Sequence, residues 1–304
     1  MIEKVGGVIL NYEYYSGQDF YSDGDDIENH ILNIVQTEEG FEYTHKDYPN
    51  WVVLYHLSRQ RENIVAPMEI KKQDEVLEIG AGMGAVTGAL AKKAAKVDCI
   101  ELSKRRSMVN AYRHKELDNI EIFVGNFQDV VINKKYDVIT LIGVFEYGAN
   151  YIDSETPYED FLQKVASCLK PGGCLYIAIE NKLGMKYLAG YHEDHLGKPF
   201  VGIEGYRKDD RVKTFSKSQL EQLLLQNGFE SPYFYYPFPD YKLPTVIYSD
   251  DSILKQPIEF TSHSNYDRDV YENFDQLKAF HSLKGAEELK VLANSFLVKA
   301  NKEN

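Results

Sequence analysis

Residues 76–90 read VLEIGAGMGAVTGAL, and this stretch predicts the unit around which the rest of the chain is arranged. A short apolar run ends in an acid and is followed by a glycine cluster and then by a helical pattern. This order is typical of a buried parallel strand, a tight turn and a helix. Because glycines lack a Cβ atom, backbone N–H groups in such a turn can closely approach a ligand. The stretch therefore predicts a cofactor site.

The glycine spacing fits two cofactors. The pattern E-x-G-x-G-x-G over residues 78–84 resembles the first motif of class I S-adenosylmethionine (SAM) methyltransferases. Gly80, Gly82 and Ala85 also satisfy the looser dinucleotide fingerprint G-x-G-x-x-A. Glu101 ends the next expected strand, where a carboxylate binds the ribose hydroxyls that NAD and SAM share. These residues do not distinguish SAM from NAD. A glycine turn that binds no ligand is a third alternative.

The composition limits the class of protein and its partners. The chain has 304 residues, of which 43% are hydrophobic and 27% charged, as in a globular protein of one domain or one and a half. Its net charge of −13 argues against nucleic acid as a partner, because phosphates attract Lys and Arg. Three cysteines without a C-x-x-C pair indicate reduced thiols and a cytoplasmic location. No apolar run approaches a membrane span, and no signal peptide opens the chain.

From residue 76 onwards strands and helices alternate, which predicts an α/β fold with a doubly wound, Rossmann-like parallel sheet. The expected strands are 76–79, 96–101, 120–125, 136–143, 174–180, 232–239 and 294–299. The expected helices are 51–67, 104–117, 158–169 and 216–227.

Three segments stand apart from this alternation. Residues 1–50, rich in Tyr and acids, predict an N-terminal cap or arm with a short helix from Ile27, and a disordered tail is the alternative. The rest, 51–300, is expected to be one domain with two insertions. Residues 182–214, after strand five, predict a lid or substrate pocket. Residues 240–290, after strand six, predict a second insertion and a candidate homodimer interface.

Candidate catalytic residues lie at strand ends and in the predicted lid. Because the carboxyl ends of the strands face the ligand crevice, Glu146 and Glu180 are candidates to act on an acceptor hydroxyl. In the run HEDH, a histidine beside a carboxylate is typical of a general base, with His195 preferred and His192 second. The run lacks a recognisable ligand pattern, so no metal site is predicted. Strand-end charges and a plain surface loop are the alternatives without function.

Together, residues 76–84, Glu101, 125–127 (GNF) and 170–173 (KPGG) resemble a class I SAM-dependent methyltransferase. The resemblance covers roughly residues 50–240 and implies a seven-stranded sheet and SAM as cofactor. It implies that Arg61 pairs with the methionine carboxylate and that 126–127 form the adenine site, where Asp is more usual than Asn. The implied SAM contacts are Arg61, Glu78, Gly80, Ala81, Gly82, Gly84, Glu101, Leu102, Asn126, Phe127 and Gly143.

Longer phrases at residues 54–58, 101–106, 179–184, 193–195 and 239–244 resemble a narrower bacterial group. Its members are often found with glycosyltransferases of cell-surface polysaccharide synthesis. The resemblance implies a sugar or glycan acceptor and a glycosyltransferase partner.

The leading hypothesis is therefore an O-methyltransferase acting on a sugar or another small hydroxylated acceptor. One alternative is an NAD-dependent oxidoreductase on the same kind of sheet. The other is a non-catalytic SAM-binding partner of a glycosyltransferase. The methyltransferase and the oxidoreductase are distinguished by whether the protein binds SAM or NAD. The non-catalytic partner is distinguished from the methyltransferase because it binds SAM without transferring a methyl group.

Overall fold

The computed structural model describes residues 1–19, 22–37, 51–261 and 270–303. The chain forms two compact units. Unit 1 comprises Met1–Leu141 with Cys168–Lys170, and unit 2 comprises Ile142–Ser167 with Pro171–Asn304. Among the described residues, no helix is long and apolar enough to cross a membrane.

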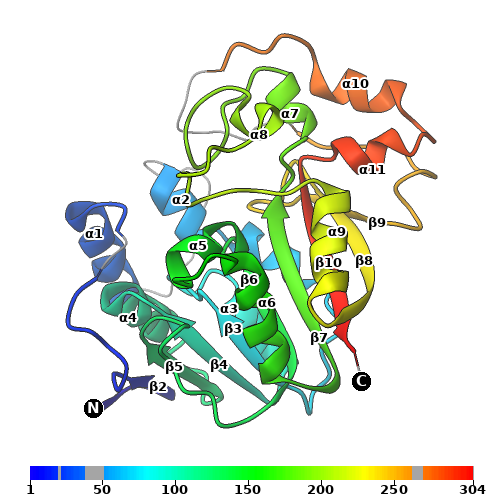
Figure 1. Cartoon of the computed structure of the whole chain (residues 1–304). Coiled ribbons are helices and arrows are strands. Elements are labelled where there is room, and N and C mark those ends of the chain that lie inside the picture. The colour runs from blue at the N-terminus through cyan, green and yellow to red at the C-terminus, as the bar shows by residue number, and fades with distance from the viewer. Residues whose placement is uncertain (20–21, 38–50, 262–269, 304) are drawn as a thin grey trace. The chain divides into compact units, whose positions relative to one another are not determined.

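Unit 1 contains the predicted parallel sheet. Its strands lie in the order β1-β2-β5-β4-β3-β6, and β5, β4, β3 and β6 run parallel. The central strand β3 is buried at four successive positions, as expected of a parallel strand covered on both faces. Helix α4 lies along β4 and β5 (Figure 1). The bounds are β3 (Glu75–Ile79), α3 (Thr87–Lys93), β4 (Lys96–Glu101), α4 (Lys104–Arg113), β5 (Ile120–Val124) and β6 (Tyr136–Ile142).

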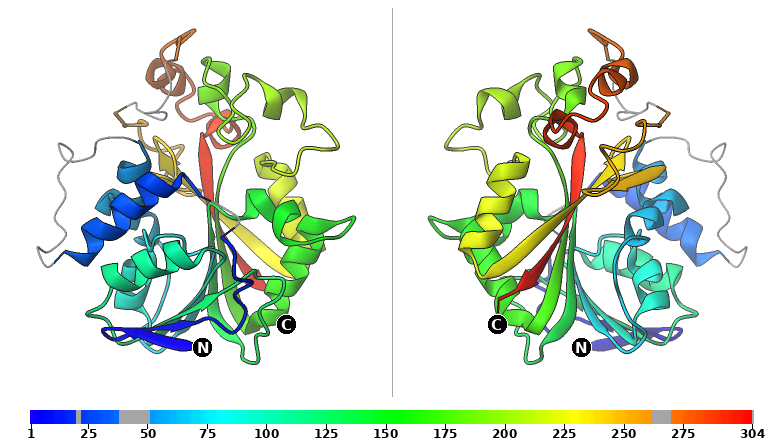
Figure 2. Two further views of the ribbon diagram at one scale, coloured as in Figure 1. Left: turned by 90° about the vertical axis from the view of Figure 1, so that its left-hand side faces the viewer. Right: turned by 90° about the vertical axis from the view of Figure 1, so that its right-hand side faces the viewer.

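The N-terminal residues extend this sheet, although they were expected to form only a cap. Strands β1 (Ile2–Val5) and β2 (Val8–Asn11) form a hairpin, and β2 pairs in parallel with β5. The hairpin lies at the edge of the unit 1 sheet (Figure 2, in dark blue). Val8 and Leu10 are fully buried, so burial alternates with a period of two along β2. The predicted helix from Ile27 is confirmed as α1 (Asp25–Gln36), which packs against α4. Residues 38–50 of the predicted cap lie outside the described residues.

The single helix predicted over residues 51–67 is wrong. The structure contains α2 (Trp51–Leu57) and then a 3-10 helix, η2 (Arg59–Val65). Ser58 separates them, because its backbone is extended and its side chain accepts a hydrogen bond from the Gln60 N–H. A serine in this conformation starts a new helix rather than continuing the old one.

Unit 2 contains an antiparallel sheet in the order β7-β10-β8-β9. The strand expected at 174–180 begins earlier, because residues 170–173 also belong to the long strand β7. Phe234 and Tyr236 of β8 pack edge-on against Phe296 of β10. Helix α9, which was expected over residues 216–227, lies along β8 and begins at a capping box on Ser216 (Figure 2). The bounds are β7 (Leu169–Glu180), α9 (Lys217–Gln226), β8 (Phe229–Phe238), β9 (Val246–Ser249) and β10 (Ser295–Lys302).

Short helices fill the two predicted insertions and the connection after β6. The described strands include the seven expected ones and also β1, β2 and β9. The result is a Rossmann-like α/β fold whose strands are mixed in direction rather than all parallel. The remaining helices are η3 (Phe145–Tyr147), α5 (Gly148–Tyr151), α6 (Pro157–Cys168), α7 (Met185–Leu188), α8 (Val201–Glu204), α10 (Gln276–Ser282) and α11 (Glu288–Leu292).

Candidate active site

The glycine turn after β3 in unit 1 has an open concave side. The backbone N–H groups of Gly80 and Ala81 donate to the carbonyl oxygen of Ile100 over 2.8 and 3.2 Å. Gly82 has a φ of 54°, which favours glycine. Among the described residues, apart from Gly82 and its two chain neighbours, no heavy atom lies within 4 Å of the place where a Cβ atom of Gly82 would stand. The turn therefore offers room for a ligand beside its backbone.

Gly84 has a different role from Gly82. A Cβ atom there would lie 2.3 Å from the Oδ1 atom of Asn110 on α4. The His114 ring, also beside Gly84, has its Nε2 2.9 Å from the Gly84 carbonyl oxygen. Burial lowers the pKa of His114 to about 3, so its ring is neutral and Nε2 donates its proton to that carbonyl. Gly84 thus allows close packing of the turn on α4.

Glu101 connects the glycine turn to the start of α4. Its side chain is 8% exposed, and Oε2 accepts a hydrogen bond from the Gly82 N–H over 2.8 Å. Oε1 accepts from the Ser103 N–H over 2.9 Å. Burial raises the pKa of Glu101, against the opposing effects of Arg106 and of these two N–H groups. Leu102 follows directly and is partly buried. The carboxylate stands at the end of β4, where the sequence predicts the ribose site.

Glu78, the acid of the glycine motif, lies inside the unit 1 core. Its side chain is 2% exposed, and its Oε2 accepts hydrogen bonds from Thr87 Oγ1 over 2.6 Å and from Cys99 Sγ over 3.4 Å. Burial raises the pKa of Glu78 to about 7. The carboxyl group therefore joins β3 to β4 and to α3.

This burial predicts that Glu78 makes the protein less stable as pH rises. Between its ordinary pKa of 4.5 and about 7, the unfolded chain releases the Glu78 proton while the folded chain keeps it. The free energy of unfolding falls over this window by about 3 kcal/mol on this account. We expect Glu78→Gln, which stays neutral, to gain stability relative to the parent between pH 5 and pH 8 in urea unfolding. Glu75→Gln, at a partly exposed site on the same strand, is the control, and equal behaviour of both variants would contradict this account.

Arg61 on η2 is a buried cation with unused donors. Its side chain is 5% exposed, and its guanidinium lies 4.0 Å from the centre of the Tyr55 ring. Nε and Nη1 have no hydrogen-bond partner in the part of the chain that the structure describes. A buried unsatisfied donor is costly, and a carboxylate of a ligand would satisfy this one. Arg61 therefore fits its predicted role at the methionine end of SAM.

The segment before α1 is attached to both α2 and α4 by ion pairs that the sequence did not predict. Asp23 Oδ2 lies 2.8 Å from His56 Nε2 and 2.7 Å from Arg106 Nη2. Arg106 also pairs with Glu28 of α1 over 2.9 Å. Burial lowers the pKa of His56 although Asp23 opposes this effect. The only sequence signal was the run of acids in this segment, which did not show which acids would be paired.

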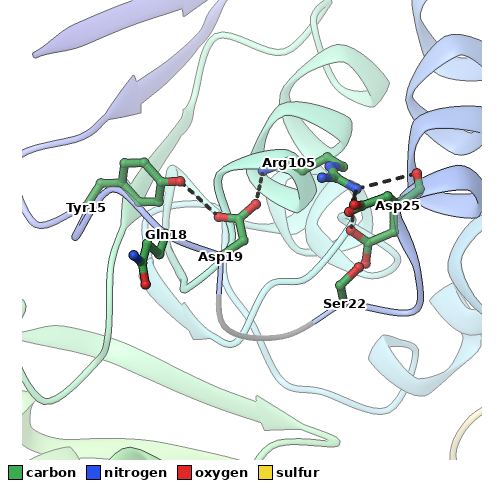
Figure 3. A pocket seen from close by; sticks show the side chains of 7 residues that line it. Tyr15, Gln18, Asp19, Ser22, Asp25 and Arg105 are labelled. Atoms are coloured by element: carbon green, nitrogen blue, oxygen red, sulfur yellow. Dashed lines mark hydrogen bonds and ion pairs between the residues drawn. The ribbon is translucent and has the colours of Figure 1, made fainter.

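Asp19 attaches the same segment to the start of α4. It accepts hydrogen bonds from the Lys104 N–H over 2.8 Å and from Ser103 Oγ over 3.0 Å. Figure 3 shows a pocket at this place, with Tyr15 bonded to Asp19 and Arg105 paired with Asp25. The Asp19 charge also helps to raise the pKa of Glu101. The N-terminal segment therefore influences the protonation of Glu101 at the predicted ribose site within unit 1.

The other predicted cofactor contacts are placed as follows. The Asn126 side chain accepts a hydrogen bond from the Gln128 N–H over 3.1 Å and so stabilises a turn. Phe127 is 2% exposed. Gly143, in unit 2, lies against the hydroxyl of Tyr241, which is 2.7 Å from where a Cβ atom would stand. None of these contacts tests the adenine assignment.

In unit 2 the structure brings together three of the four predicted catalytic residues. One ligand-type atom each of Glu146, Glu180 and His195 lies within 4.8 Å of the others. His195 Nε2 is 3.3 Å from Glu180 Oε2, and His195 Nδ1 is 3.0 Å from the Tyr147 hydroxyl. Glu146 is 1% exposed, and no described residue forms a hydrogen bond with its Oε2. We call these three residues the Glu–Glu–His cluster. His192 is not part of it and forms an isolated backbone bridge with Pro199.

Two lysines and two aspartates hold this cluster in place. Lys242 Nζ lies 2.5 Å from Glu180 Oε1 and 2.6 Å from Asp194 Oδ1. Lys186 Nζ lies 2.8 Å from Asp194 Oδ2 and 3.8 Å from Asp240 Oδ2. The sequence analysis noted the phrases that contain Asp194, Asp240 and Lys242 but gave these residues no role.

The charges of the cluster shift its pKa values in opposite directions. Burial and the neighbouring Glu180 raise the pKa of Glu146 to about 8. Burial alone would raise the pKa of Glu180, but Lys242 and His195 hold it well below its usual range. Burial alone would lower the pKa of His195, but Glu180 raises it to about 9. At neutral pH Glu180 is ionised, His195 carries a proton, and Glu146 titrates nearest to neutrality.

Comparison with known proteins assigns more than half of the chain to one protein family. A family model described as a methyltransferase domain matches residues 54–231, which is more than half of the sequence. Its range includes the glycine turn, Glu101 and all three members of the cluster. The SAM alternative for the glycine pattern is therefore the correct one, and the NAD alternative is wrong.

Individual relatives match shorter stretches. A probable ribosomal RNA small subunit methyltransferase A of Methanosarcina mazei is 40% identical over 85 residues, which are 25% of this chain and 31% of that protein. The mitochondrial ubiquinone biosynthesis O-methyltransferase of Dictyostelium discoideum is 24% identical, over 38% of this chain and 37% of that protein. The match thus spans about a third of the length of these curated relatives. A solved SAM-dependent methyltransferase of Thermotoga maritima, described as a possible histamine N-methyltransferase, is 16% identical over 90% of this chain and 100% of that chain, with a TM-score of 0.48.

Proposed function

The chain belongs to the methyltransferase domain family and is an enzyme with SAM as its cofactor, and we propose that it methylates a hydroxyl group of a sugar in polysaccharide or glycan synthesis. The observation that carries the proposal is the buried Glu–Glu–His cluster with the unpartnered Glu146 Oε2. A buried oxygen acceptor without a partner suits a ligand that brings its own O–H donor. The resemblance to the bacterial group with glycosyltransferases supports a sugar as that ligand.

The acceptors named for the two relatives fit this site less well. Ribosomal RNA is bound through phosphates by Lys and Arg, whereas this chain has a net charge of −13. A quinone ring suits an apolar pocket, whereas the cluster consists of charged and hydrogen-bonding groups. A small polar acceptor with several hydroxyl groups matches the cluster better than RNA or a quinone does.

In the proposed reaction the chain's own residues orient the acceptor and remove a proton. SAM supplies an electrophilic methyl group on a sulfonium, so alignment of the acceptor oxygen is the main task. Glu146 accepts a hydrogen bond from the acceptor hydroxyl and then takes its proton. Its pKa of about 8 is near neutrality, as a general base requires. The pKa of Glu146 lies closer to neutrality than the pKa of His195, which is about 9, and this supports Glu146 over His195 as the base. As the O–H bond breaks, the O–CH3 bond forms and the C–S bond electrons stay on sulfur, which leaves S-adenosylhomocysteine.

Unit 1 supplies the proposed SAM contacts. The backbone of residues 80–82 lines the open side of the turn, Glu101 binds the ribose, and Asn126 with Phe127 contacts the adenine. Glu78 and Gly84 support the turn through the core contacts described above, and Leu102 follows Glu101. The fit rests on the open space at Gly82 and on the unpartnered donors of Arg61.

A variant of Arg61 should affect binding of the methionine part of SAM but not binding of the adenosine part. We expect Arg61→Met to weaken SAM binding by about 10- to 100-fold, the loss of one charge-assisted hydrogen bond. Binding of 5′-methylthioadenosine, which lacks the amino acid part, is expected to stay within about twofold of the parent in calorimetric titrations. Arg59→Met, at an exposed site of the same 3-10 helix, is the control. Equal losses for both ligands would show that Arg61 does not bind the carboxylate.

Transfer of labelled methyl groups tests the acceptor class directly. Purified chain with methyl-labelled SAM is offered nucleotide sugars, glycans and, for comparison, RNA. The proposal expects label on a sugar oxygen together with release of S-adenosylhomocysteine. Label on RNA alone would overturn it. The proposal also includes a glycosyltransferase partner, a homodimer through residues 240–290, a lid at 182–214 and a cytoplasmic location. A pull-down experiment tests the glycosyltransferase partner, and sedimentation tests the homodimer.

A further inference from the structure

We propose that the Glu–Glu–His cluster of unit 2 binds a divalent metal ion through Glu146, Glu180 and His195. No metal was expected from the sequence, because only the pair His192 and His195 was considered there. The proposal deepens the proposed function, since it rests on the same cluster as the acceptor site.

The geometry of the three residues fits one ion. Oxygen and nitrogen ligands lie about 2.0–2.2 Å from a first-row divalent ion, so neighbouring ligand atoms are about 3–3.5 Å apart. His195 Nε2 and Glu180 Oε2 are 3.3 Å apart. One possible ligand atom from each of Glu146, Glu180 and His195 lies within 4.8 Å of the other two. The side chains come from η3, the end of β7 and the loop after α7, which converge within unit 2. All three are at least nine-tenths buried.

The second observation is an oxygen atom of Glu146 that accepts no hydrogen bond. Glu146 is only 1% exposed, and its Oε2 has no hydrogen-bond partner among the residues that the structure describes. Native proteins rarely leave a buried carboxylate oxygen without a partner, so such an atom indicates a missing ligand. An ion beside Glu180 and His195 would supply that partner.

Charge in the cluster is compatible with a divalent cation. Lys186 and Lys242 are matched by Asp194 and Asp240, which lie within 4.0 Å of one or both lysines. A metal ion binds carboxylate and imidazole groups in their deprotonated forms, so a divalent ion would replace the protons that Glu146 and His195 hold without changing the net charge of the cluster. Lys242 contacts Oε1 of Glu180 and so leaves Oε2 for the ion.

The surroundings orient the ligand atoms toward one point. With a proton on Nδ1, His195 donates to the Tyr147 hydroxyl, which leaves the lone pair of Nε2 facing Glu180. Such a hydrogen bond on the second ring nitrogen is the usual support of a metal-binding histidine. Glu193 accepts from the His195 backbone N–H over 2.9 Å and fixes the loop.

The ion would act on the acceptor hydroxyl. Three protein ligands leave coordination positions open for a hydroxyl oxygen of the sugar. Bound there, the hydroxyl loses its proton more readily, because the ion stabilises the alkoxide. The proton goes to the oxygen of Glu146 that does not bind the ion, and the methyl transfer then proceeds as above. Carboxylate and imidazole ligands together suit Mn²⁺ or another first-row ion, so Mn²⁺ is the probe.

The test measures the binding of Mn²⁺ to the full chain without acceptor. The electron paramagnetic resonance signal of the free ion gives the fraction that is not bound. We expect one site in the parent that is weakened at least tenfold in Glu146→Gln and in His195→Gln. Glu230→Gln, at an exposed carboxylate of β8, is the matched control and should bind as the parent does. Circular dichroism confirms that each variant is folded. Equal binding by the parent and both folded cluster variants would overturn the proposal. If neither variant folds, a single tight site in the parent that raises its melting temperature supports the proposal, and its absence overturns it.

This readout separates the metal from the acceptor. Tight binding lost in the variants, without methyl transfer to any sugar, would support the metal site and count against the sugar acceptor. Methyl transfer to a sugar that is unchanged by a chelator, without a tight Mn²⁺ site, would overturn the metal site and leave the proposed function standing.

Discussion

Glu101→Ala is expected to weaken SAM binding by about 100-fold. The carboxylate accepts hydrogen bonds from the Gly82 and Ser103 N–H groups and, in the proposed complex, from the ribose hydroxyls. Removing it leaves two buried N–H donors unpaired and deletes two contacts to the ligand. Charge-assisted hydrogen bonds of this kind contribute about 1.5–3 kcal/mol each, and about 2.7 kcal/mol corresponds to 100-fold in affinity.

Calorimetric titration with SAM and S-adenosylhomocysteine measures this effect. Glu116→Ala, at an exposed position after α4, removes the same charge from the same unit and should bind as the parent does. Glu101→Gln keeps one acceptor for the backbone and should lie between parent and Ala variant. SAM binding that is unchanged in a folded Glu101→Ala protein would remove Glu101 from the cofactor site.

Glu146→Gln is expected to lower kcat by about 10²- to 10⁴-fold, the usual contribution of a positioned base. The amide keeps the shape of the side chain but neither takes a proton nor carries a charge. SAM affinity should stay within about twofold of the parent, because the proposed SAM contacts other than Gly143 belong to unit 1. His195→Ala should also slow methyl transfer, since it removes the cation beside Glu180.

Single-turnover transfer of labelled methyl groups, with SAM affinity measured in parallel, checks this prediction. Glu230→Gln again serves as the control, because it removes one carboxylate charge from unit 2 at an exposed site. A Glu146→Gln enzyme as fast as the parent would show that the cluster does not activate the acceptor. A loss of SAM affinity equal to the loss of rate would assign Glu146 to cofactor binding instead.

Most strands were predictable because their signals are local. The strand β3 is a nearly continuous apolar run, and the glycine turn that follows has a spacing typical of a strand–turn–helix unit. The capping box at Ser216 likewise marks the start of α9 within four residues. The break at Ser58 was missed because the apolar pattern of residues 51–67 continues across it, and only the cap geometry ends the first helix.

The edge strands were not predictable in the same way. The strand β2 is short, and its partner β5 lies more than 100 residues further along the chain. Strand β9 likewise depends on pairing with β8 rather than on a strong pattern of its own. Such pairings gain stability only once the rest of the sheet is formed, so a local window contains little information about them.

The sequence by itself determined the glycine turn, the position of Glu101 and the succession of the central strands along the chain, because all three depend on residues close together in the chain. Only the tertiary structure distinguished the open space at Gly82 from the tight packing at Gly84. It alone placed Glu146 beside Glu180 and His195, and it alone brought Lys242 to them from a distant loop. Burial and charge–charge contacts set the chemistry of that cluster, and both arise from long-range packing, which no spacing in the sequence contains.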